Sequence, residues 1–463
     1  MLERKVVGGY TILTWGCQMN EDDSAQMASM LELAGYEQAE LDKADVILLN
    51  TCSVRAKPEQ KVYSQLGQLR ELKNHKPETI IGVCGCMAQK EAPEIRRRAP
   101  HVDLVIGTGQ IDRLPALVQR IKDERKPIIA TDLPSRQDRA DKNTPMRVIQ
   151  SGAPKLKSFV SISYGCDKFC TFCIVPMTRG KERSRPADDI VLEVERLASL
   201  GTKEITLLGQ TVNSYGKFLD VPCSFAELLG RLNDIEGIER IRYTSPYPKD
   251  FKSDVVQAIA TLPKVMPQVH MPVQVGDDNL LLRMHRGYTL DQYREIVRSL
   301  RAAVPDIAIT TDIMLGFPGE TEEEFENTLN FVREIRFDSA FMFAYSPREG
   351  TKAAEMPDQL PQEVKIRRLE ALIELVNRTT IEINATQIGN VYPVLVEKRS
   401  PKDPTKWSGL TPQGKTMNFP AGRDLIGQMV MVRALTAQVY GYTGELIPAK
   451  EERGIPLNML AAV

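Results

Sequence analysis

Three cysteines lie within eight residues of one another in the stretch Ser-Tyr-Gly-Cys-Asp-Lys-Phe-Cys-Thr-Phe-Cys-Ile-Val at positions 163–175. Cys166, Cys170 and Cys173 have the spacing C-x3-C-x2-C. Thiolates this close on one loop can converge on a single iron–sulfur cube, because cysteine is the soft ligand that such clusters require. A cube has four iron corners and this loop offers three ligands, so one iron would stay open to a small molecule.

Structural zinc is the alternative for this stretch. Zinc sites usually pair one C-x2-C with a second C-x2-C or with a pair of histidines. No such partner lies nearby in the sequence. The spacing therefore favours an iron–sulfur cluster over zinc.

Three further cysteines, Cys17, Cys52 and Cys86, each follow a predicted strand at intervals of 35 and 34 residues. One βα unit has about this length, so all three thiols should reach the carboxyl edge of one sheet, where open α/β folds bind ligands. Helix amino termini at that edge would favour an anionic cluster. Three unrelated buried cysteines are the alternative. Cys84 is interpreted as a packed strand residue, with a substitute ligand as the alternative, and Cys223 as structural.

Strands and helices alternate through the first 126 residues, which predicts a parallel sheet flanked by helices. A helix should run to Leu33, capped by Asp22, Asp23 or Ser24 and ended by Gly35. The other helices are predicted over 57–72, 89–97 and 114–121. The strands are predicted over 10–15, 46–49, 80–83 and 104–106.

The alternation resumes after the cysteine-rich stretch. Strands are predicted over 159–163, 204–208, 240–244, 269–272, 308–315 and 340–345. Helices are predicted over 187–199, 225–235, 251–261, 278–302 and 321–335. Six such units suit a partial (β/α)6 barrel, whose active site would lie at the carboxyl ends of the strands.

The predicted domains are an N-terminal α/β domain at 8–126, a linker at 127–151, the barrel at 152–382, a small β-rich domain at 384–448 and a tail at 449–463. The linker carries prolines without periodicity and one short strand at 127–130. A helix over 362–382 precedes the β-rich domain. Strands there are predicted over 391–396, 429–435 and 438–446.

These motifs together resemble the radical S-adenosylmethionine (SAM) methylthiotransferases. The superfamily's cluster loop has the 166–173 spacing with an aromatic residue, here Phe172, before the last cysteine. Gly-Cys-Gln-Met-Asn at 16–20, Asn-Thr-Cys-Ser-Val-Arg at 50–55 and Gly-Cys-Met-Ala-Gln at 85–89 are similar to the family's N-terminal motifs. The resemblance implies two [4Fe-4S] clusters. One would be held by Cys166, Cys170 and Cys173 with an exchangeable SAM, and an auxiliary one by Cys17, Cys52 and Cys86.

The resemblance also implies SAM-contacting loops at the strand ends. The loop at 208–215 could hold the methionine group, the loop at 270–274 could reach the ribose, and the glycines of 311–321 permit close approach to adenine. Each stretch alone would be an ordinary turn, and their order along the chain favours SAM. The expected contacts are Phe172, Gln210, Asn213, Gln274, Arg286, Asp312 and Gly316, with Arg286 pairing a carboxylate.

Two regions have a basic balance. Residues 149–185 contain seven Lys or Arg against two acidic residues, which we interpret as polyanion contacts, a solvated loop being the alternative. Residues 384–448 contain seven against four and resemble the OB-like, RNA-binding TRAM domain. Trp407, Phe419 and Tyr442 could stack on bases there, or could fill the core of the barrel.

By resemblance to the bacterial MiaB-type branch, the expected reaction is methylthiolation at C2 of N6-isopentenyladenosine (N6-dimethylallyladenosine) at position 37 of tRNA, consuming two SAM molecules per turnover. The expected partners are the anticodon stem-loop of tRNA, an electron donor such as flavodoxin or ferredoxin, and a sulfur or iron–sulfur carrier. Alternatives are a related methylthiotransferase acting on threonylcarbamoyl-adenosine in tRNA or on a ribosomal-protein aspartate, and a non-catalytic iron–sulfur protein that binds RNA or acts as a sensor.

The 463 residues are 42% hydrophobic and 26% charged, as in ordinary globular proteins, with a net charge of −1. The eight cysteines are too sparse for a disulfide scaffold. No apolar leader or bilayer-spanning run is present in the sequence. We therefore expect a cytoplasmic protein with reduced thiols, no membrane contact and a monomeric state.

Overall fold

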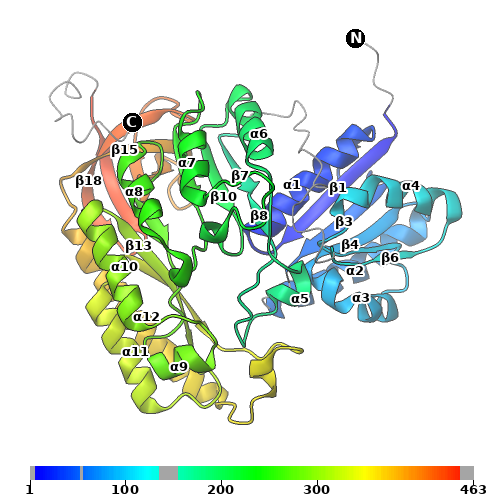
Figure 1. Cartoon of the computed structure of the whole chain (residues 1–463). Helices are drawn as coiled ribbons and strands as arrows, with labels where there is room; N and C mark the ends of the chain where they lie inside the picture. Colours follow the sequence, from blue (N-terminus) through cyan, green and yellow to red (C-terminus); the bar gives the residue numbers. More distant parts are fainter. Residues whose placement is uncertain (1–5, 53–55, 135–154, 449–463) are drawn as a thin grey trace.

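The computed structural model describes residues 6–52, 56–134 and 155–448 and has three units along the chain (Figure 1). A parallel α/β sheet domain is followed by a partial barrel of βα units and then by a closed β-barrel. The predicted fold class is therefore confirmed. Positions 53–55 of the second cysteine motif, most of the predicted linker and the predicted tail lie outside the described residues.

The N-terminal sheet has six parallel strands in the order β2-β1-β3-β4-β5-β6. The central strands β3 and β4 are buried along their whole length, which explains their apolar runs. The short strand expected in the linker is β6, which pairs with β5. This sheet therefore extends into the range predicted as linker. The strands are β1 (Gly8–Trp15), β2 (Tyr36–Gln38), β3 (Val46–Thr51), β4 (Ile80–Gly85), β5 (Leu104–Ile106) and β6 (Ile128–Ala130).

Four helices cover this sheet, namely α1 (Gln18–Leu33), α2 (Ala56–His75), α3 (Cys86–Arg98) and α4 (Leu114–Glu124). The predicted start of the first helix is wrong. α1 begins directly after Cys17, because Cys17 is extended and its N–H donates to Asn20 Oδ1 at 3.3 Å. Asp22 and Asp23 therefore lie inside the helix, where both are buried.

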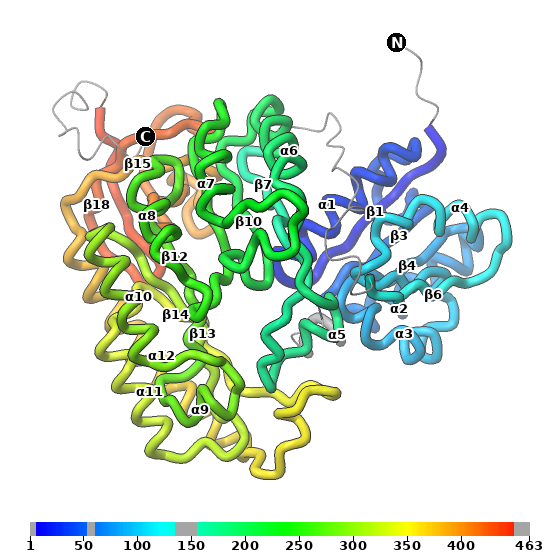
Figure 2. The backbone as a smooth tube through the Cα atoms, viewed as in Figure 1, coloured from blue at the N-terminus to red at the C-terminus, as the bar shows by residue number. Residues whose placement is uncertain are grey.

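The central unit consists of two three-stranded parallel sheets, joined by a parallel bridge between Ile241 and Val265. Six strands thus follow one another in chain order, as predicted for a partial barrel, and the helices lie outside them (Figure 2). The strands are β7 (Lys157–Ser161), β10 (Glu204–Leu208), β11 (Arg240–Tyr243), β12 (Gln268–His270), β13 (Ala308–Leu315) and β14 (Ser339–Ala344). The main helices are α6 (Ala187–Ser199), α7 (Phe225–Asn233), α8 (Ser253–Thr261), α10 (Leu290–Ala303), α11 (Glu322–Ile335) and α12 (Gln362–Ala385).

The single helix predicted over 278–302 is wrong. The chain forms α9 (Asp278–Arg283) and then α10, because His285 and Gly287 adopt positive φ angles of 57° and 68° that an α-helix cannot contain. The intervening turn brings Arg286 to the cysteine loop.

The C-terminal unit is a closed barrel in the order β15-β16-β17-β19-β18. Trp407, Phe419 and Tyr442 are at most 2% exposed in its core, so the base-stacking interpretation of these residues is wrong. The sequence reading missed β16 and β17, and it assigned Gln438, which ends β18, to the last strand. The strands are β15 (Val391–Arg399), β16 (Lys406–Leu410), β17 (Thr416–Pro420), β18 (Met429–Gln438) and β19 (Gly441–Leu446).

The small barrel packs at the amino-terminal ends of the central strands. Arg240, the first residue of β11, donates to the carbonyl oxygens of Leu410 and Pro393 at 2.7 Å each. Lys157, the first residue of β7, pairs with Glu397 at 2.8 Å. Among the helices of the described ranges, none is both long and apolar enough to cross a bilayer.

Candidate metal centres

The structure brings Cys17, Cys52 and Cys86 together at the carboxyl edge of the N-terminal sheet. Cys17 lies between β1 and α1, Cys52 follows β3, and Cys86 is the first residue of α3. The thiols of Cys17 and Cys86 both hydrogen-bond with that of Cys52. Neighbouring parallel strands end at the same edge, so residues 35 and 34 positions apart meet there as predicted.

A buried pair of asparagines lies beside the three thiols and explains the residues around them. Asn20 Nδ2 donates to Asn50 Oδ1 at 3.1 Å, and Asn50 Nδ2 donates to the Asn20 carbonyl oxygen at 2.8 Å. Gly85 has φ = 88°, and a Cβ there would lie only 2.7 Å from the Thr51 carbonyl oxygen and would overlap Asn50. Each cysteine motif thus supplies one residue to this interlocked set.

Electrostatics favour the thiolate form of two members of this set. Hydrogen bonding with Cys52 lowers the pKa of Cys17 and that of Cys86, against the effect of burial. Arg179 contributes to both shifts through its positive charge. The same hydrogen bonds and burial raise the pKa of Cys52.

The chemistry of the donor set fits an iron–sulfur cluster, because soft sulfur donors are the ligands of such clusters. Cys84 is fully buried among apolar side chains of the sheet core, and Cys223 is buried in the core of the central unit.

The Cys166, Cys170 and Cys173 loop follows β7 and β8 (Ser163–Tyr164) and precedes α5 (Val175–Arg179). The Cys166 N–H donates to the Gly180 carbonyl at 3.1 Å, and the Cys173 N–H donates to the Cys170 carbonyl at 3.0 Å. Thr171 anchors the loop to the end of α9 through its N–H, which donates to the Met284 carbonyl at 3.1 Å. The loop is therefore anchored at its start and in its middle, and a turn closes its last four residues.

Burial raises the pKa of Cys166 to about 12 and that of Cys173 to about 11. Arg286 is 6% exposed and lies against this loop, with Nη1 3.5 Å from Cys170 Sγ. Its Nη2 also donates to the Pro272 carbonyl at 2.8 Å. The buried positive charge of Arg286 thus faces the Cys170 thiol. The sequence predicts a carboxylate as a partner of Arg286.

The other expected SAM-contacting residues have different surroundings. Phe172 packs against the core of the central unit, and Gln210 is half-buried in the loop after β10. Gln274 has φ = 76°, and its backbone joins β13 through Asp312 and Met314. Asp312 lies 3.3 Å from His270 Nε2. These residues come from loops and strand ends of one barrel face.

Asn213 and Gly316 make protein contacts that the sequence did not suggest. Asn213 Nδ2 donates to the Tyr247 carbonyl at 2.9 Å, and its Oδ1 accepts from the Tyr247 N–H at 2.7 Å. The Gly316 N–H donates to Glu320 Oε2 at 2.6 Å, and a Cβ there would overlap Lys365. The Asn213 amide therefore joins the loops after β10 and β11.

Four residues of the basic run around the cysteine loop pair with carboxylates, and two of them, Arg179 and Arg185, are buried, so the interpretation as polyanion contacts is wrong for those two. Lys157 pairs with Glu204 at 3.0 Å, and Arg185 pairs with Glu193 at 2.8 Å. Lys168 pairs with Asp250. Arg179 pairs with Asp23 at 2.6 Å, with both side chains at most 4% exposed. Folding therefore uses these charges to join elements.

Glu182 is a buried carboxylate that sequence reasoning missed. It is 1% exposed, and neither carboxylate oxygen has a hydrogen-bond partner among the described residues. Burial raises its pKa to about 7, although Lys217 and Lys168 oppose the shift. A buried polar group without a partner is rare and costly. Its only sequence signal is its place between two basic residues after the cysteine loop.

The TRAM-like barrel carries several exposed basic side chains. The Arg399 guanidinium lies 3.5 Å from the centre of the Trp407 ring, and Trp407 Nε1 donates to the Arg423 carbonyl at 3.0 Å. Lys398, Lys402 and Arg423 are exposed and have no ion-pair partner within the described part of the chain. Tyr440, at the β18–β19 turn, is 78% exposed.

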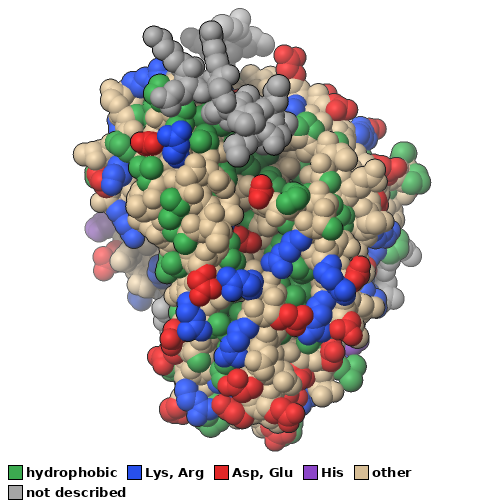
Figure 3. Space-filling view, turned by 90° about the vertical axis from the view of Figure 1, so that its left-hand side faces the viewer, with side chains coloured by type: hydrophobic (Ala, Val, Ile, Leu, Met, Phe, Trp, Pro, Cys, Tyr) green, Lys and Arg blue, Asp and Glu red, His purple; other side chains and the backbone are tan. Residues whose placement is uncertain are grey.

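Elsewhere the surface charges are mixed. On the face shown in Figure 3, Lys and Arg side chains alternate with Asp and Glu. Two ion pairs at the molecular surface are Arg294 with Glu334 at 2.7 Å and Arg336 with Glu382 at 3.0 Å.

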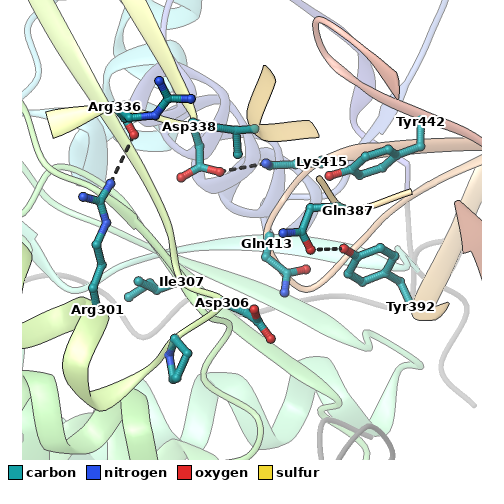
Figure 4. Close-up of a pocket in the computed structure, with 12 residues that line it drawn as sticks. Arg301, Asp306, Ile307, Arg336, Asp338, Gln387, Tyr392, Gln413, Lys415 and Tyr442 are labelled. Carbon is teal, nitrogen blue, oxygen red and sulfur yellow. Dashed lines mark hydrogen bonds and ion pairs between the residues drawn. The ribbon is translucent and has the colours of Figure 1, made fainter. Parts of the chain in front are cut away.

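A polar pocket of about 240 Å³ lies between the central unit and the small barrel (Figure 4). Arg301, Asp306 and Lys415 are among its lining residues, and Lys415 pairs with Asp338 at 2.7 Å. Asp306 and Asp338 directly precede β13 and β14, so the pocket lies at the opposite strand ends from the cysteines.

Three family models match the chain. Residues 9–107 match uncharacterized protein family UPF0004, residues 160–332 match the radical SAM superfamily, and residues 385–446 match the TRAM domain. Together with the two cysteine sites, these matches define the class as a radical SAM enzyme with a TRAM domain.

A tRNA-2-methylthio-N(6)-dimethylallyladenosine synthase of Moorella thermoacetica is 46% identical over 450 residues, which cover 95% of this chain and 98% of the relative. One from Carboxydothermus hydrogenoformans is 42% identical over 441 residues, covering 95% and 99%. The chain belongs to the family of tRNA-2-methylthio-N(6)-dimethylallyladenosine synthases.

Two solved structures resemble the fold. The radical SAM methyltransferase TsrM from Kitasatospora setae, with cobalamin and a [4Fe-4S] cluster bound, aligns with a TM-score of 0.55, 14% identity and coverage of 74% of this chain and 77% of that one. The cobalamin-dependent radical SAM enzyme OxsB, with aqua-cobalamin and SAM bound, aligns with a TM-score of 0.52 and 14% identity over 80% and 56%. At this identity the likeness concerns the fold alone.

We expect the two cysteine sets to hold iron independently. Replacing Cys166, Cys170 and Cys173 by Ala should leave about half of the iron and sulfide after anaerobic reconstitution, because the auxiliary ligands remain. Chemical analysis of iron and sulfide measures this. The matched control is Cys84→Ala, a buried cysteine near the other set, which should keep all the iron. Full retention in the triple variant, or iron loss in the control, would contradict the assignment.

Glu182 should make stability depend on pH. Its pKa rises from 4.5 to about 7 on folding, so the folded protein favours the neutral carboxyl group. The free energy of unfolding therefore falls as the pH rises from 4.5 through 7. At about 1.4 kcal/mol per pKa unit the total loss is about 3 kcal/mol. Glu182→Gln should abolish this loss in urea unfolding of the reduced, metal-free protein at pH 4.5 and 8. The exposed Glu374→Gln should behave as the wild type, and an unchanged pH dependence in Glu182→Gln would disprove the assignment.

Proposed function

We propose that this chain methylthiolates C2 of N6-isopentenyladenosine at position 37 of tRNA, giving 2-methylthio-N6-isopentenyladenosine. The name of its full-length relatives supports this substrate. The structural observation that carries the proposal is the pair of three-cysteine sites in contacting domains, joined by the ion pair of Asp23 with Arg179 at 2.6 Å. Two such sites are what the reaction needs, because carbon activation and sulfur donation are separate tasks.

Six cysteines would hold two [4Fe-4S] clusters. Cys166, Cys170 and Cys173 leave one iron for SAM, and Cys17, Cys52 and Cys86 leave one iron at the auxiliary site. When bound, the clusters and two SAM molecules per turnover supply the electron, the sulfur, the methyl group and the radical chemistry that an inert aromatic C–H bond requires. The chain's part is to hold these groups and the base close together.

The barrel side chains would orient SAM. Arg286 contacts the cluster loop and has five N–H donors, so it can contact a carboxylate as well as Cys170. Gln210, Gln274 and Asp312 lie on the same barrel face and offer amide and carboxylate groups. Asn213 and Gly316, whose side-chain amide and N–H are already bonded, would shape the loops and contact SAM through neighbouring backbone atoms.

The TRAM domain would bind the tRNA away from the reaction centre. Its exposed Lys398, Lys402 and Arg423 suit phosphates, and the exposed Tyr440 suits stacking on a base. This domain lies at the amino-terminal ends of the central strands, opposite the cysteines. A ligand that contacts both places must be large, which favours a folded RNA over a free nucleoside.

Further partners of the proposed reaction follow from its chemistry. A one-electron donor such as flavodoxin or ferredoxin would reduce the clusters, and a sulfur or iron–sulfur carrier would restore the auxiliary site. We place the enzyme in the cytoplasm as a monomer. The alternative substrates, threonylcarbamoyl-adenosine in tRNA and a ribosomal-protein aspartate, are less supported because the relatives carry the dimethylallyladenosine name.

The reduced, reconstituted enzyme should convert isopentenyl-modified tRNA to its 2-methylthio form, measured by mass spectrometry of nucleosides, with release of 5′-deoxyadenosine. Replacing Cys17, Cys52 and Cys86 by Ala should abolish the methylthio product but keep SAM cleavage, because the other cluster loop is intact. Cys84→Ala is the control. Modification of threonylcarbamoyl-adenosine instead would transfer the proposal to that substrate, and no SAM cleavage by the intact enzyme would favour the non-catalytic RNA-binding alternative.

The exposed cations of the small barrel should bind tRNA phosphates. Lys402→Glu combined with Arg423→Glu should weaken tRNA binding, and the slope of log Kd against log salt should fall by about 2, one for each lost contact. Fluorescence anisotropy over a salt series measures both. Arg298→Glu, at an exposed position of α10, is the control. An unchanged slope would show that the tRNA does not contact Lys402 and Arg423.

A further inference from the structure

Two consecutive aspartates of α1 connect the auxiliary cysteine site to both sides of the C-x3-C-x2-C loop. Asp22 Oδ2 accepts from Ser161 Oγ at 2.5 Å, and Ser161 ends β7 just before that loop. Asp23 Oδ2 accepts from Arg179 Nη2 at 2.6 Å, and Arg179 ends α5 just after it. The helix that begins after Cys17 therefore holds the loop at its entry and its exit.

These four side chains are almost completely removed from water. Asp22 and Asp23 are each 1% exposed, Ser161 is 0% and Arg179 is 5%. An exposed ion pair would constrain little, whereas a buried one leaves an uncompensated charge when a partner is lost. Aspartate is a poor residue for a helix interior, and neither Asp22 nor Asp23 lies at the start of α1. Their contacts with the second domain explain why two aspartates lie inside this helix.

Neighbouring contacts extend the same interface. One turn after Asp22, Gln26 Nε2 donates to Tyr164 Oη at 3.1 Å and to Asp22 Oδ2 at 3.0 Å. Thr108, after β5, donates to the Thr178 carbonyl of α5 at 2.5 Å. In Figure 1, α1 lies along β7 and β8 between the two domains. The link thus involves two elements of the first domain and three of the second, and it does not depend on one pair.

We propose that Asp22, Asp23, Ser161 and Arg179 form an interdomain clamp that fixes the position of one cysteine site relative to the other. Asp23 and Arg179 are then positioning residues, acting through the elements that carry the cysteines. The proposal rests on the proposed function, because only a reaction that uses both sites needs them in a fixed relation. Misplacement of reacting groups by about 1 Å can cost about 100-fold in rate.

The test variant is Arg179→Gln in the reconstituted enzyme. Iron analysis should show that both clusters still load. In the EPR spectrum, the spin–spin interaction between the two reduced clusters should become weaker, and its strength should vary more from molecule to molecule. Hydrogen exchange of α1 and α5 amides should become at least tenfold faster. The ratio of 5′-deoxyadenosine to methylthiolated nucleoside should rise about tenfold or more, with KM for tRNA unchanged, because SAM cleavage needs only one site.

Arg97→Gln is the matched control, since it removes an exposed ion pair with Glu94 at 2.6 Å on α3 of the N-terminal domain. If Arg179→Gln retains the wild-type EPR coupling, exchange protection and product ratio, the clamp is refuted. If it does not fold, Ser161→Ala and Gln26→Ala, which remove only neutral donors, decide by the same readouts. If the wild type makes no methylthiolated nucleoside, the proposed function fails, whereas EPR coupling and exchange still judge the clamp.

Discussion

The parallel pairing of β1, β3 and β4 is the constraint on which the auxiliary site depends. Because these strands are neighbours in register, the residues after them meet at one edge although they are 35 and 34 positions apart. Asn20, Asn50 and Gly85 then stabilise that edge, because each of them comes from a different cysteine motif and they contact one another. The cysteines are thereby held without a disulfide or a long loop, and the helices that begin there add favourable dipoles.

The two cysteine sites lie in different electrostatic surroundings. Hydrogen bonding within the auxiliary set and the charge of Arg179 lower the pKa of Cys17 and Cys86, whereas burial raises the pKa of Cys166 and Cys173. Arg179 belongs to the second domain but acts on the first, so the properties of one site depend on docking against the other. At the second site, the guanidinium of Arg286 is the positive charge that lies against Cys170.

Charge counts along the sequence were a poor guide to RNA contacts. The basic run around the cysteine loop contains Arg179 and Arg185, yet both form buried ion pairs, Arg179 with the distant Asp23 and Arg185 with Glu193 on the next helix. Of the two roles considered for the aromatic residues of the small barrel, packing in its core is confirmed, because a barrel of about sixty residues has few other large side chains to pack. Lys398, Lys402, Arg423 and Tyr440 are exposed at its surface.

The sequence by itself determined the six cysteines, the alternation of strands and helices and the order of three domains. These are local features, because cysteine spacing and hydrophobic period can be read within one βα unit. Only the tertiary structure decided the start of α1, the break between α9 and α10 and the partners of Asp22, Asp23 and Arg179. The partners of these three residues lie more than a hundred positions away, where burial makes a charge pair or a hydrogen bond decisive, and no local pattern records them.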